Sequence, residues 1–287
     1  MARRAGKIAE LRKSRENFIL VDCGDMFHNS RSIPQIRAET ILEGISRMHY
    51  DAVNLAEGEL ELGASFLNEK LASYPIELVS ANVDIKSGQK GAVSVKPYII
   101  KDFGTFRVAV TGIASKVLFH ADARLDKNVE ITEPLSSLKP ILAELKDKAD
   151  VVILLSHFML KGTQNFLTYN PLPELSVAVA GHGRNLTKNP EKVGDTLIVQ
   201  NSMGGEYLSV LTLELDNSLK ITSHAVENIP LTDEVPEDEF LQKKLAQFKA
   251  TESKAQAEKH KPKNVSKEQT EVLKLSPEAF IKRMNAD

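Results

Sequence analysis

Short apolar runs alternate with segments of helical periodicity as far as about residue 200. The apolar runs end in glycine, proline or polar residues, as buried strands do. Between the runs, apolar residues recur every three or four positions, as in Ile41, Ile45 and Met48 after Pro34. The pattern predicts strands at 18–22, 51–55, 76–83, 149–157 and 175–182, and helices around Ile8 and Leu11, at 36–48, 66–71 and 134–147.

Two further pairs of segments have the pattern of antiparallel strands. "YIIKD" (98–102) and "FRVAVTGIAS" (106–115) flank a short turn, which predicts a hairpin. "TLIVQN" (196–201) and "YLSVLTLELD" (207–216) alternate more openly, which indicates antiparallel pairing near a sheet edge. Strands that alternate with helices in this way are typical of an α/β fold.

The composition changes near residue 230. Phe240, Leu241, Leu245 and Phe248 recur at helical spacing behind an acidic first turn. Residues 251–271 are polar and charged, which predicts a linker. "SPEAFIKRM" (276–284) then predicts a short helix capped by Ser276. We therefore predict one domain at 1–235, followed by a helix, a charged linker and a short terminal helix at 236–287.

Net charge and composition exclude several partners. The formal net charge of −2 gives no electrostatic basis for binding a nucleic acid polymer or an acidic membrane. No apolar run is long enough for a membrane span. The basic N-terminal segment has no apolar stretch after it, so we expect no signal peptide in the chain as given, and a longer natural precursor stays open.

Polar side chains with metal-binding or catalytic chemistry follow the predicted buried strands. Asp25, Glu57, Asn82, His157 and His182 each stand where such a strand ends. Ligands bind at the carboxyl edge of α/β sheets, so these residues are candidates for one site. Carboxylates with two imidazoles are the ligand set expected for Zn, Mn or Fe. The alternative is that each residue is only hydrogen-bonded within the fold.

Other reactive residues have a simpler interpretation. Cys23 lies in a predicted strand and is expected to be a packed, inert thiol, because nothing nearby lowers its pKa. The remaining histidines lack a strand-end setting and are expected at the surface: His28, His49, His120, His224 and His260.

The order of these segments resembles that of the calcineurin-like metallophosphoesterases, and most closely their 5′-nucleotidase/UDP-sugar hydrolase branch. The resemblance covers about residues 3–235 and implies a four-layer α/β/β/α sandwich. It is carried by "FILVDCGDMFHNS", "DAVNLAEGELELG", "ELVSANV", "VVILLSH" and "VAVAGHGRN" followed by "LIVQNSMGGEYLSVLTLELD".

The resemblance also implies a ligand set. Asp25 matches the aspartate that bridges two metals in the family, and His157 and His182 match ligand histidines. Glu57 stands where the family has a ligand asparagine, and Glu59 matches the family's glutamate. Two further family positions are changed: Gly58 replaces a histidine that stabilises the transition state, and Arg184 replaces the last ligand histidine. The family's opening Asp-x-His strand has no counterpart in the sequence given.

These matches predict one divalent transition metal (Mn, Zn or Fe) held by Asp25, Glu57, His157 and His182, with Arg184 as a candidate anion clamp. The predicted function is hydrolysis of a phosphate ester or other small anion with reduced or altered activity. The alternatives are a catalytically inactive binding or structural module of a larger exported protein, and a site that holds no metal.

The branch carries a C-terminal domain that stacks the nucleobase, and the resemblance does not extend to such a domain here. We therefore do not expect specificity for 5′-nucleotides, and another module beyond the C-terminus stays open. Because relatives of this branch are exported, the resemblance favours a periplasmic or otherwise exported protein.

Overall fold

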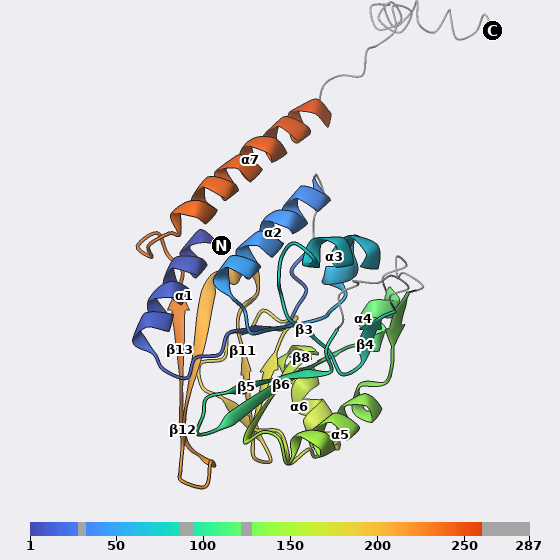
Figure 1. Cartoon of the computed structure of the whole chain (residues 1–287), viewed down its shortest axis with the longest axis vertical. Helices are drawn as coiled ribbons and strands as arrows, with labels where there is room; N and C mark the ends of the chain where they lie inside the picture. The colour runs from blue at the N-terminus through green and yellow to red at the C-terminus, as the bar shows by residue number, and fades with distance from the viewer. Residues whose placement is uncertain (28–32, 87–94, 122–127, 260–287) are drawn as a thin grey trace, which may run out of the picture. The chain divides into compact units, whose positions relative to one another are not determined.

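The computed structural model describes residues 1–27, 33–86, 95–121 and 128–259, and two sheets dominate it (Figure 1). The smaller sheet is parallel, with the order β1-β2-β3. The larger has the order β10-β11-β9-β8-β6-β5, with parallel pairing from β11 through β6. The strands are β1 (Val21–Asp22), β2 (Ala52–Asn54), β3 (Leu78–Val79), β5 (Tyr98–Asp102), β6 (Arg107–Ala114), β8 (Val151–His157), β9 (Val177–Ala180), β10 (Glu191–Val193) and β11 (Thr196–Gln200).

An apolar core fills the space between the two sheets. Val151, Ile153 and Leu155 of β8 face the smaller sheet, where they join a cluster that includes Ala52 and Val79. The alternate residues of β8 point to the other side and pack among helices. Because β8 is buried on both faces, it appears in the sequence as an unbroken apolar run rather than an alternating one.

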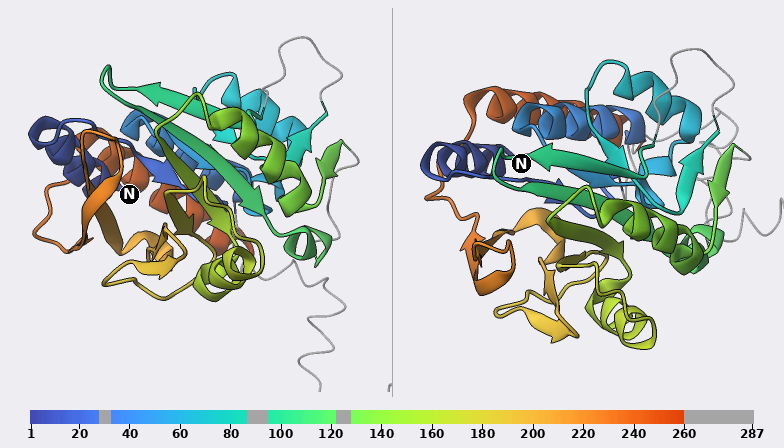
Figure 2. Two further views of the ribbon diagram at one scale, coloured as in Figure 1. Left: turned by 90° about the horizontal axis from the view of Figure 1, so that it is seen from below. Right: turned by 60° about the horizontal axis from the view of Figure 1, so that its bottom comes forward.

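Helices form the two outer layers. The helices α1 (Ala2–Ser14), α2 (Pro34–Met48) and α3 (Ala64–Leu71) share a core cluster with the smaller sheet. On the opposite side, α5 (Pro134–Leu145) and α6 (Met159–Tyr169) pack against the larger sheet. Figure 2 shows the sheets between these helices. The predicted four-layer α/β/β/α sandwich is confirmed.

Shorter elements complete the fold. The hairpin β5–β6 is antiparallel, as predicted. Two more antiparallel pairs join β4 to β7 and β12 to β13. The remaining elements are β4 (Val83–Ile85), β7 (Val129–Ile131), β12 (Tyr207–Leu215), β13 (Ile221–Pro230), α4 (Lys116–Ala121), α7 (Glu239–Lys259) and the 3₁₀ turns η1 (Gly58–Leu60) and η2 (Met203–Gly205).

Several elements differ from the prediction. The segment 196–201 was predicted to pair antiparallel near an edge, and β11 does lie next to the edge strand β10 and pairs antiparallel with it. On its other side, however, β11 pairs parallel with β9, and it is buried at every position. The segment 76–83 is not one strand. The Ser80 hydroxyl accepts the amides of Asn82 and Val83 and turns the chain between β3 and β4. The periodicity gave no signal for α4, α6 or β13.

The C-terminal helix is longer than its sequence pattern predicts. The chain divides into the units Met1–Phe248 and Lys249–Asp287, and within the described residues α7 runs on to Lys259 through residues predicted as linker. Alanine, glutamate, lysine and glutamine there are good helix formers, so a polar composition did not exclude a helix. The predicted terminal helix lies outside the described residues, and the boundary at 235 stays a prediction. Among described helices, none has the length and apolar content for crossing a membrane.

Candidate metal centre

Four side chains from distant parts of the chain converge beside the carboxyl ends of the strands. Asp25 follows β1, Glu57 follows β2, His157 ends β8, and His182 follows β9. One ligand atom from each lies within 4.8 Å of every other. His157 Nε2 is 2.9 Å from His182 Nδ1, and each of these nitrogens is 3.4 Å from Glu57 Oε1. The described residues contain no other group of three or more such side chains.

Backbone conformation aims two of these side chains. Asp25 has φ of 68° and His182 has φ of 57°, both in the left-handed region that non-glycine residues rarely adopt. The preceding Gly181 does not make this turn, since its φ is not positive. A Cβ at Gly181 would lie 2.5 Å from Cys23 Cβ, so glycine is needed there for close packing. The sharp turn is therefore in His182 itself.

A backbone carbonyl fixes the tautomer of His157. Its Nδ1 donates to the Cys23 carbonyl oxygen over 2.9 Å, which leaves the Nε2 lone pair facing the centre. Asn54 donates to the Ile113 carbonyl over 3.0 Å and, over 3.4 Å, to the same Cys23 oxygen. Asn54 is fully buried. It was missed by sequence reasoning because the predicted strand at 51–55 runs past it, whereas in the structure Asn54 is the last residue of β2.

Glu59 holds together the two loops that carry the carboxylate ligands. It is fully buried, and its carboxylate accepts the amides of Asp25, Met26 and Ala56 at 2.9, 2.6 and 3.0 Å. The loop after β1 is thereby joined to the loop after β2. Glu59 thus positions Asp25 and Glu57, and it is not itself a member of the ligand group.

The group is electrostatically coupled. Burial disfavours a charged imidazole, yet the hydrogen bond and negative charge of Glu57 raise the pKa of His157 above its ordinary value. Burial also disfavours ionised Glu57, but the two imidazoles hold its pKa below the usual range. Burial raises the pKa of Glu59 to about 7, against the three amides that favour its carboxylate form.

The residues fit a divalent transition metal. For bonds of about 2.1 Å, neighbouring ligand atoms stand about 3.0 to 3.4 Å apart in octahedral or tetrahedral geometry. The distances of 2.9 and 3.4 Å match that range, and His182 Nδ1 to Asp25 Oδ2 is slightly longer at 3.8 Å. Glu57 Oε2 is buried without a hydrogen-bond partner among the described residues. A divalent ion supplies Lewis acidity, which polarises a phosphoryl oxygen and acidifies a coordinated water.

Other predicted site residues lie differently. Asn82 is buried, and its amide is fully used by backbone groups of Ala114 and Thr132. Arg184 is exposed, and the described residues include no ion-pair partner for it. A Cβ at Gly58 would lie 2.2 Å from Asp25 Oδ1, so this position, where the family has a histidine, leaves no room for a side chain.

The remaining reactive residues have no role in the ligand group. Cys23 is buried, its thiol donates to the Val179 carbonyl, and burial raises its pKa, in agreement with an inert thiol. It lies just after β1 rather than within it. His49 and His224 are exposed, as expected. His28 and His260 lie outside the described residues, and so does the side chain of His120.

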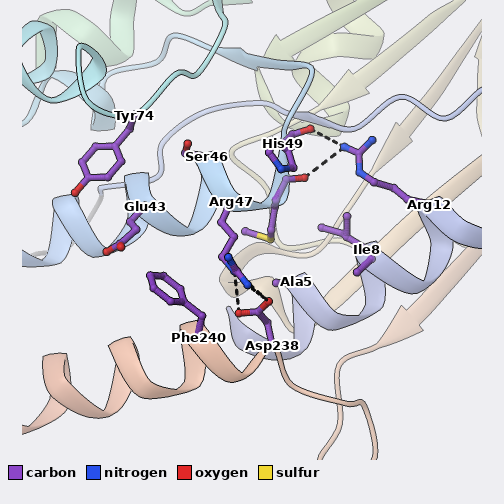
Figure 3. Close-up of a pocket in the computed structure, with 12 residues that line it drawn as sticks. Ala5, Ile8, Arg12, Glu43, Ser46, Arg47, His49, Tyr74, Asp238 and Phe240 are labelled. Atoms are coloured by element: carbon purple, nitrogen blue, oxygen red, sulfur yellow. Dashed lines mark hydrogen bonds and ion pairs between the residues drawn. The ribbon is translucent and has the colours of Figure 1, made fainter.

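A groove of about 500 Å³ lies elsewhere, between α1, α2 and the start of α7 (Figure 3). Its floor is apolar, with Ile8 and Met48, and its rim includes the Arg47–Asp238 ion pair. Arg12 donates to the Met48 and His49 carbonyls, so its guanidinium caps the carboxyl end of α2. None of the four candidate ligands lines this groove, which is therefore a separate surface feature.

The fold is that of the metallophosphoesterases, and the strand-end ligand group lies where the resemblance to them places metal ligands. No family model matches the sequence. The chain is 25% identical to the snake venom 5′-nucleotidase of Naja atra, covering 87% of this chain and 51% of that protein. It is 24% identical to the 5′-nucleotidase of Homo sapiens, covering 83% and 45%. It thus spans about half the length of these relatives and matches their N-terminal part.

Solved structures give the same answer for the fold. The 5′-nucleotidase precursor from Thermus thermophilus superposes with a TM-score of 0.76 at 23% identity, covering 87% of this chain and 52% of that one. The calcineurin-like phosphoesterase YfkN from Bacillus subtilis has a TM-score of 0.70 at 20% identity, covering 89% and 90%. The predicted resemblance to calcineurin-like phosphoesterases of the 5′-nucleotidase branch is therefore confirmed.

Proposed function

We propose that this chain is a phosphoesterase of reduced or altered activity whose centre holds one divalent transition metal. The observation that carries the proposal is the convergence of Asp25, Glu57, His157 and His182, with ligand atoms within 4.8 Å of one another. Two carboxylates and two imidazoles suit Mn, Fe or Zn. Relatives with 5′-nucleotidase activity in their names support hydrolysis of phosphate esters as the reaction class.

The chain's own residues would perform distinct tasks at this centre. His157 is fixed by the Cys23 carbonyl and presents Nε2, while Glu57 presents Oε1 to both imidazoles. The backbone N–H of Asp25 donates to the Glu59 carboxylate, and this hydrogen bond holds Asp25 in place. Arg184, two residues after His182 and exposed, is proposed to contact the anionic group of the substrate. Export of the protein is proposed from the same relatives.

A second candidate is a binding module without turnover, favoured by the packing of Gly58. No imidazole can stand at that position while Asp25 keeps its place, because a Cβ there would clash with the Asp25 carboxylate. Loss of one donor aimed at developing charge typically costs about 3 to 4 kcal/mol of transition-state stabilisation. Slow turnover, or none, is the consequence.

Metal analysis followed by turnover tests the two candidates. Protein purified without a histidine tag and incubated with Mn or Zn should hold about one equivalent of metal, and less than about a tenth would contradict the centre. Turnover of a generic phosphodiester with added Mn, abolished by Asp25→Asn, would support the enzyme. Stoichiometric metal without turnover above that of the variant would favour the binding module.

A further inference from the structure

A methionine with a strained backbone stands between the segments that carry the two ligand histidines. Met159 has φ of 60°, in the left-handed region that a methionine rarely adopts. Its N–H donates to the Gly181 carbonyl oxygen over 3.0 Å, directly before His182. It also follows His157 by two residues. Both links place the backbone of Met159 beside the candidate metal centre.

Contacts with buried hydroxyl groups hold this conformation. The Thr163 hydroxyl donates to the Met159 carbonyl oxygen over 2.8 Å and lies 2.8 Å from the Ser156 hydroxyl. Ser156 and Thr163 are fully buried. Strained backbone that the surrounding structure holds in this way is concentrated at functional sites. Glycine would adopt the same conformation without strain, so the methionine side chain is retained at a cost in stability.

The side chain of Met159 does not fill the core. It is 47% exposed and belongs to none of the three core clusters. A second exposed apolar side chain follows the neighbouring strand. Strand β6 pairs with β8 so that Ala114 lies beside His157, and Val117, three residues after Ala114, is 76% exposed. Two neighbouring strands thus each lead into an exposed apolar side chain at the sheet edge where the ligand group lies.

An apolar side chain at this edge is suited to the organic part of a substrate. The methionine side chain is flexible and its thioether is polarisable, so it adapts to carbon-rich groups of varied shape. A sugar hydroxyl placed against it would lose water without gaining a good hydrogen-bond partner. Resting on the proposed function, we propose that Met159 contacts the alcohol part of the phosphate ester and favours esters of apolar alcohols over esters of sugars.

Two esters of equal charge test the preference in the wild-type protein. Cyclohexylmethyl phosphate and ribose 5-phosphate each join a ring to phosphate through a CH₂ group, and they differ in the polarity of the ring. In both reactions water adds to phosphorus, the bond from phosphorus to the alcohol oxygen breaks, and a proton from water passes to the alcohol, giving inorganic phosphate. The Mn-loaded protein should favour the cyclohexylmethyl ester by about fivefold or more in kcat/KM. Equal values, or a preference for ribose 5-phosphate, would overturn the proposal.

Substitutions that change polarity at similar size test the role of Met159. Met159→Gln keeps the length of the side chain but replaces the thioether with a polar amide, so the ratio of kcat/KM should fall by about threefold to tenfold. Met159→Leu stays apolar and should keep the ratio within about twofold. Tyr169→Gln is the matched control, because Tyr169 is 81% exposed at the opposite end of α6, and it should leave the ratio unchanged. No fall in Met159→Gln, or an equal fall in Tyr169→Gln, would refute the role of Met159.

Binding of phosphonates provides a readout that needs no turnover. Phenylphosphonate and methylphosphonate, which have no ester bond, are titrated into Mn-loaded protein and followed by calorimetry. Phenylphosphonate should bind about fivefold more tightly to the wild type, and this advantage should shrink in Met159→Gln. The absence of a preference in the wild type would overturn the proposal.

The Mn affinity of the same variant separates substrate contact from positioning of the histidines. Met159→Gln should bind Mn as tightly as the wild type, because it changes no metal ligand. Weaker Mn binding together with the lost preference would mean that Met159 acts through the histidine segments and not on the substrate. If neither ester is hydrolysed, the proposed enzyme function fails, while the phosphonate ratio still decides the role of Met159.

Discussion

Two polar groups at strand ends differ in how their hydrogen-bonding capacity is used. Asn82, between β3 and β4, donates to the Ala114 and Thr132 carbonyls at 3.0 and 3.2 Å and accepts the Ala114 amide at 2.9 Å. At the candidate metal centre, by contrast, Glu57 Oε2 is buried without a partner among the described residues, and both imidazoles turn a nitrogen toward Glu57. One group is satisfied by the backbone, and the other is left for a ligand.

This difference shows that a polar residue after a buried strand has two separate uses. When its atoms are consumed by backbone groups, it joins segments of the fold, as buried polar groups usually do. When several such residues direct unsatisfied or weakly satisfied atoms at one point, the fold keeps a costly arrangement that a cation would relieve. Substitutions at the two groups should therefore affect different measurements.

The largest effect is expected for Asp25→Asn. The variant should lose affinity for Mn or Zn by at least about a hundredfold, because a charged ligand becomes neutral. Asparagine tolerates the positive φ at this position better than alanine does, so the fold should be retained. Calorimetric titration with metal measures the affinity, and urea denaturation of metal-free protein measures the stability.

The free energy of unfolding of metal-free Asp25→Asn should stay within about 1 kcal/mol of the wild type, because reduced repulsion with Glu59 offsets the lost attraction to the imidazoles. A variant that binds metal as tightly as wild type would remove Asp25 from the ligand group. A large loss of stability would show that Asp25 serves the fold, as Asn82 does.

Asn82→Ala should show the opposite pattern. The substitution leaves the Ala114 amide and two carbonyls buried without their partner, and each such group costs about 1 to 3 kcal/mol. The free energy of unfolding should fall by about 3 kcal/mol, while the metal affinity of the folded protein stays within about twofold. Weakened metal binding at temperatures where the variant is fully folded would contradict the separation of the two groups.

The sequence predicts which polar residues stand at strand ends better than it predicts the hydrogen-bond partners of those residues. The residues Asp25, Glu57, His157 and His182 could be singled out because buried parallel strands bring their carboxyl ends to one edge. Asn82 gave the same signal, and nothing local in the sequence shows that its amide is taken by Ala114 and Thr132. Asn54 gave no signal, because its role depends on carbonyls from two other segments. Such partnerships are tertiary and have no local pattern.

Long elements were predicted more reliably than short ones for a related reason. The apolar run of β8 is visible because both faces are buried. The two-residue strands β1 and β3 are defined by their hydrogen bonds to β2, which no periodicity encodes. The polar residues 251–259 were misjudged because helix propensity and apolar periodicity are independent, and α7 there has the first without the second.

Glu59→Gln should lower both the metal affinity and the free energy of unfolding. Each loss should be smaller than the main effect of Asp25→Asn on affinity or of Asn82→Ala on stability. The glutamine amide group can no longer accept from all three backbone amides, so at least one buried N–H loses its partner. Stability should fall by about 1 to 2 kcal/mol, and metal affinity by about tenfold as Asp25 loses its fixed position. Glu61→Gln, measured in parallel, should change neither by a comparable amount. Retained metal affinity in Glu59→Gln would show that the two loops are held by other contacts.

The smallest effect is a difference in pH dependence between metal-free and metal-loaded protein. In metal-free protein, the raised pKa of His157 contributes stability that is complete below about pH 6.5 and is lost as pH rises through the folded pKa. Glu59, with a pKa raised to about 7, also makes stability fall as pH rises. Between about pH 4.5 and pH 7 the unfolded state has released this proton while the folded state still holds it. Stability of the metal-free protein should therefore fall between about pH 5.5 and pH 8 by on the order of 1 to 3 kcal/mol.

Bound metal should make stability rise with pH instead of fall. Only the neutral imidazole of His157 can bind the ion, so metal binding tightens as this imidazole loses its proton. Tighter binding to the folded state adds stability. Urea denaturation at several pH values, with and without Mn, measures both curves. Asn82→Ala should lower both curves by the same amount and leave their slopes unchanged, whereas in Asp25→Asn the two curves should coincide. Parallel curves in the wild type, with and without Mn, would mean that the imidazole of His157 does not take part in metal binding.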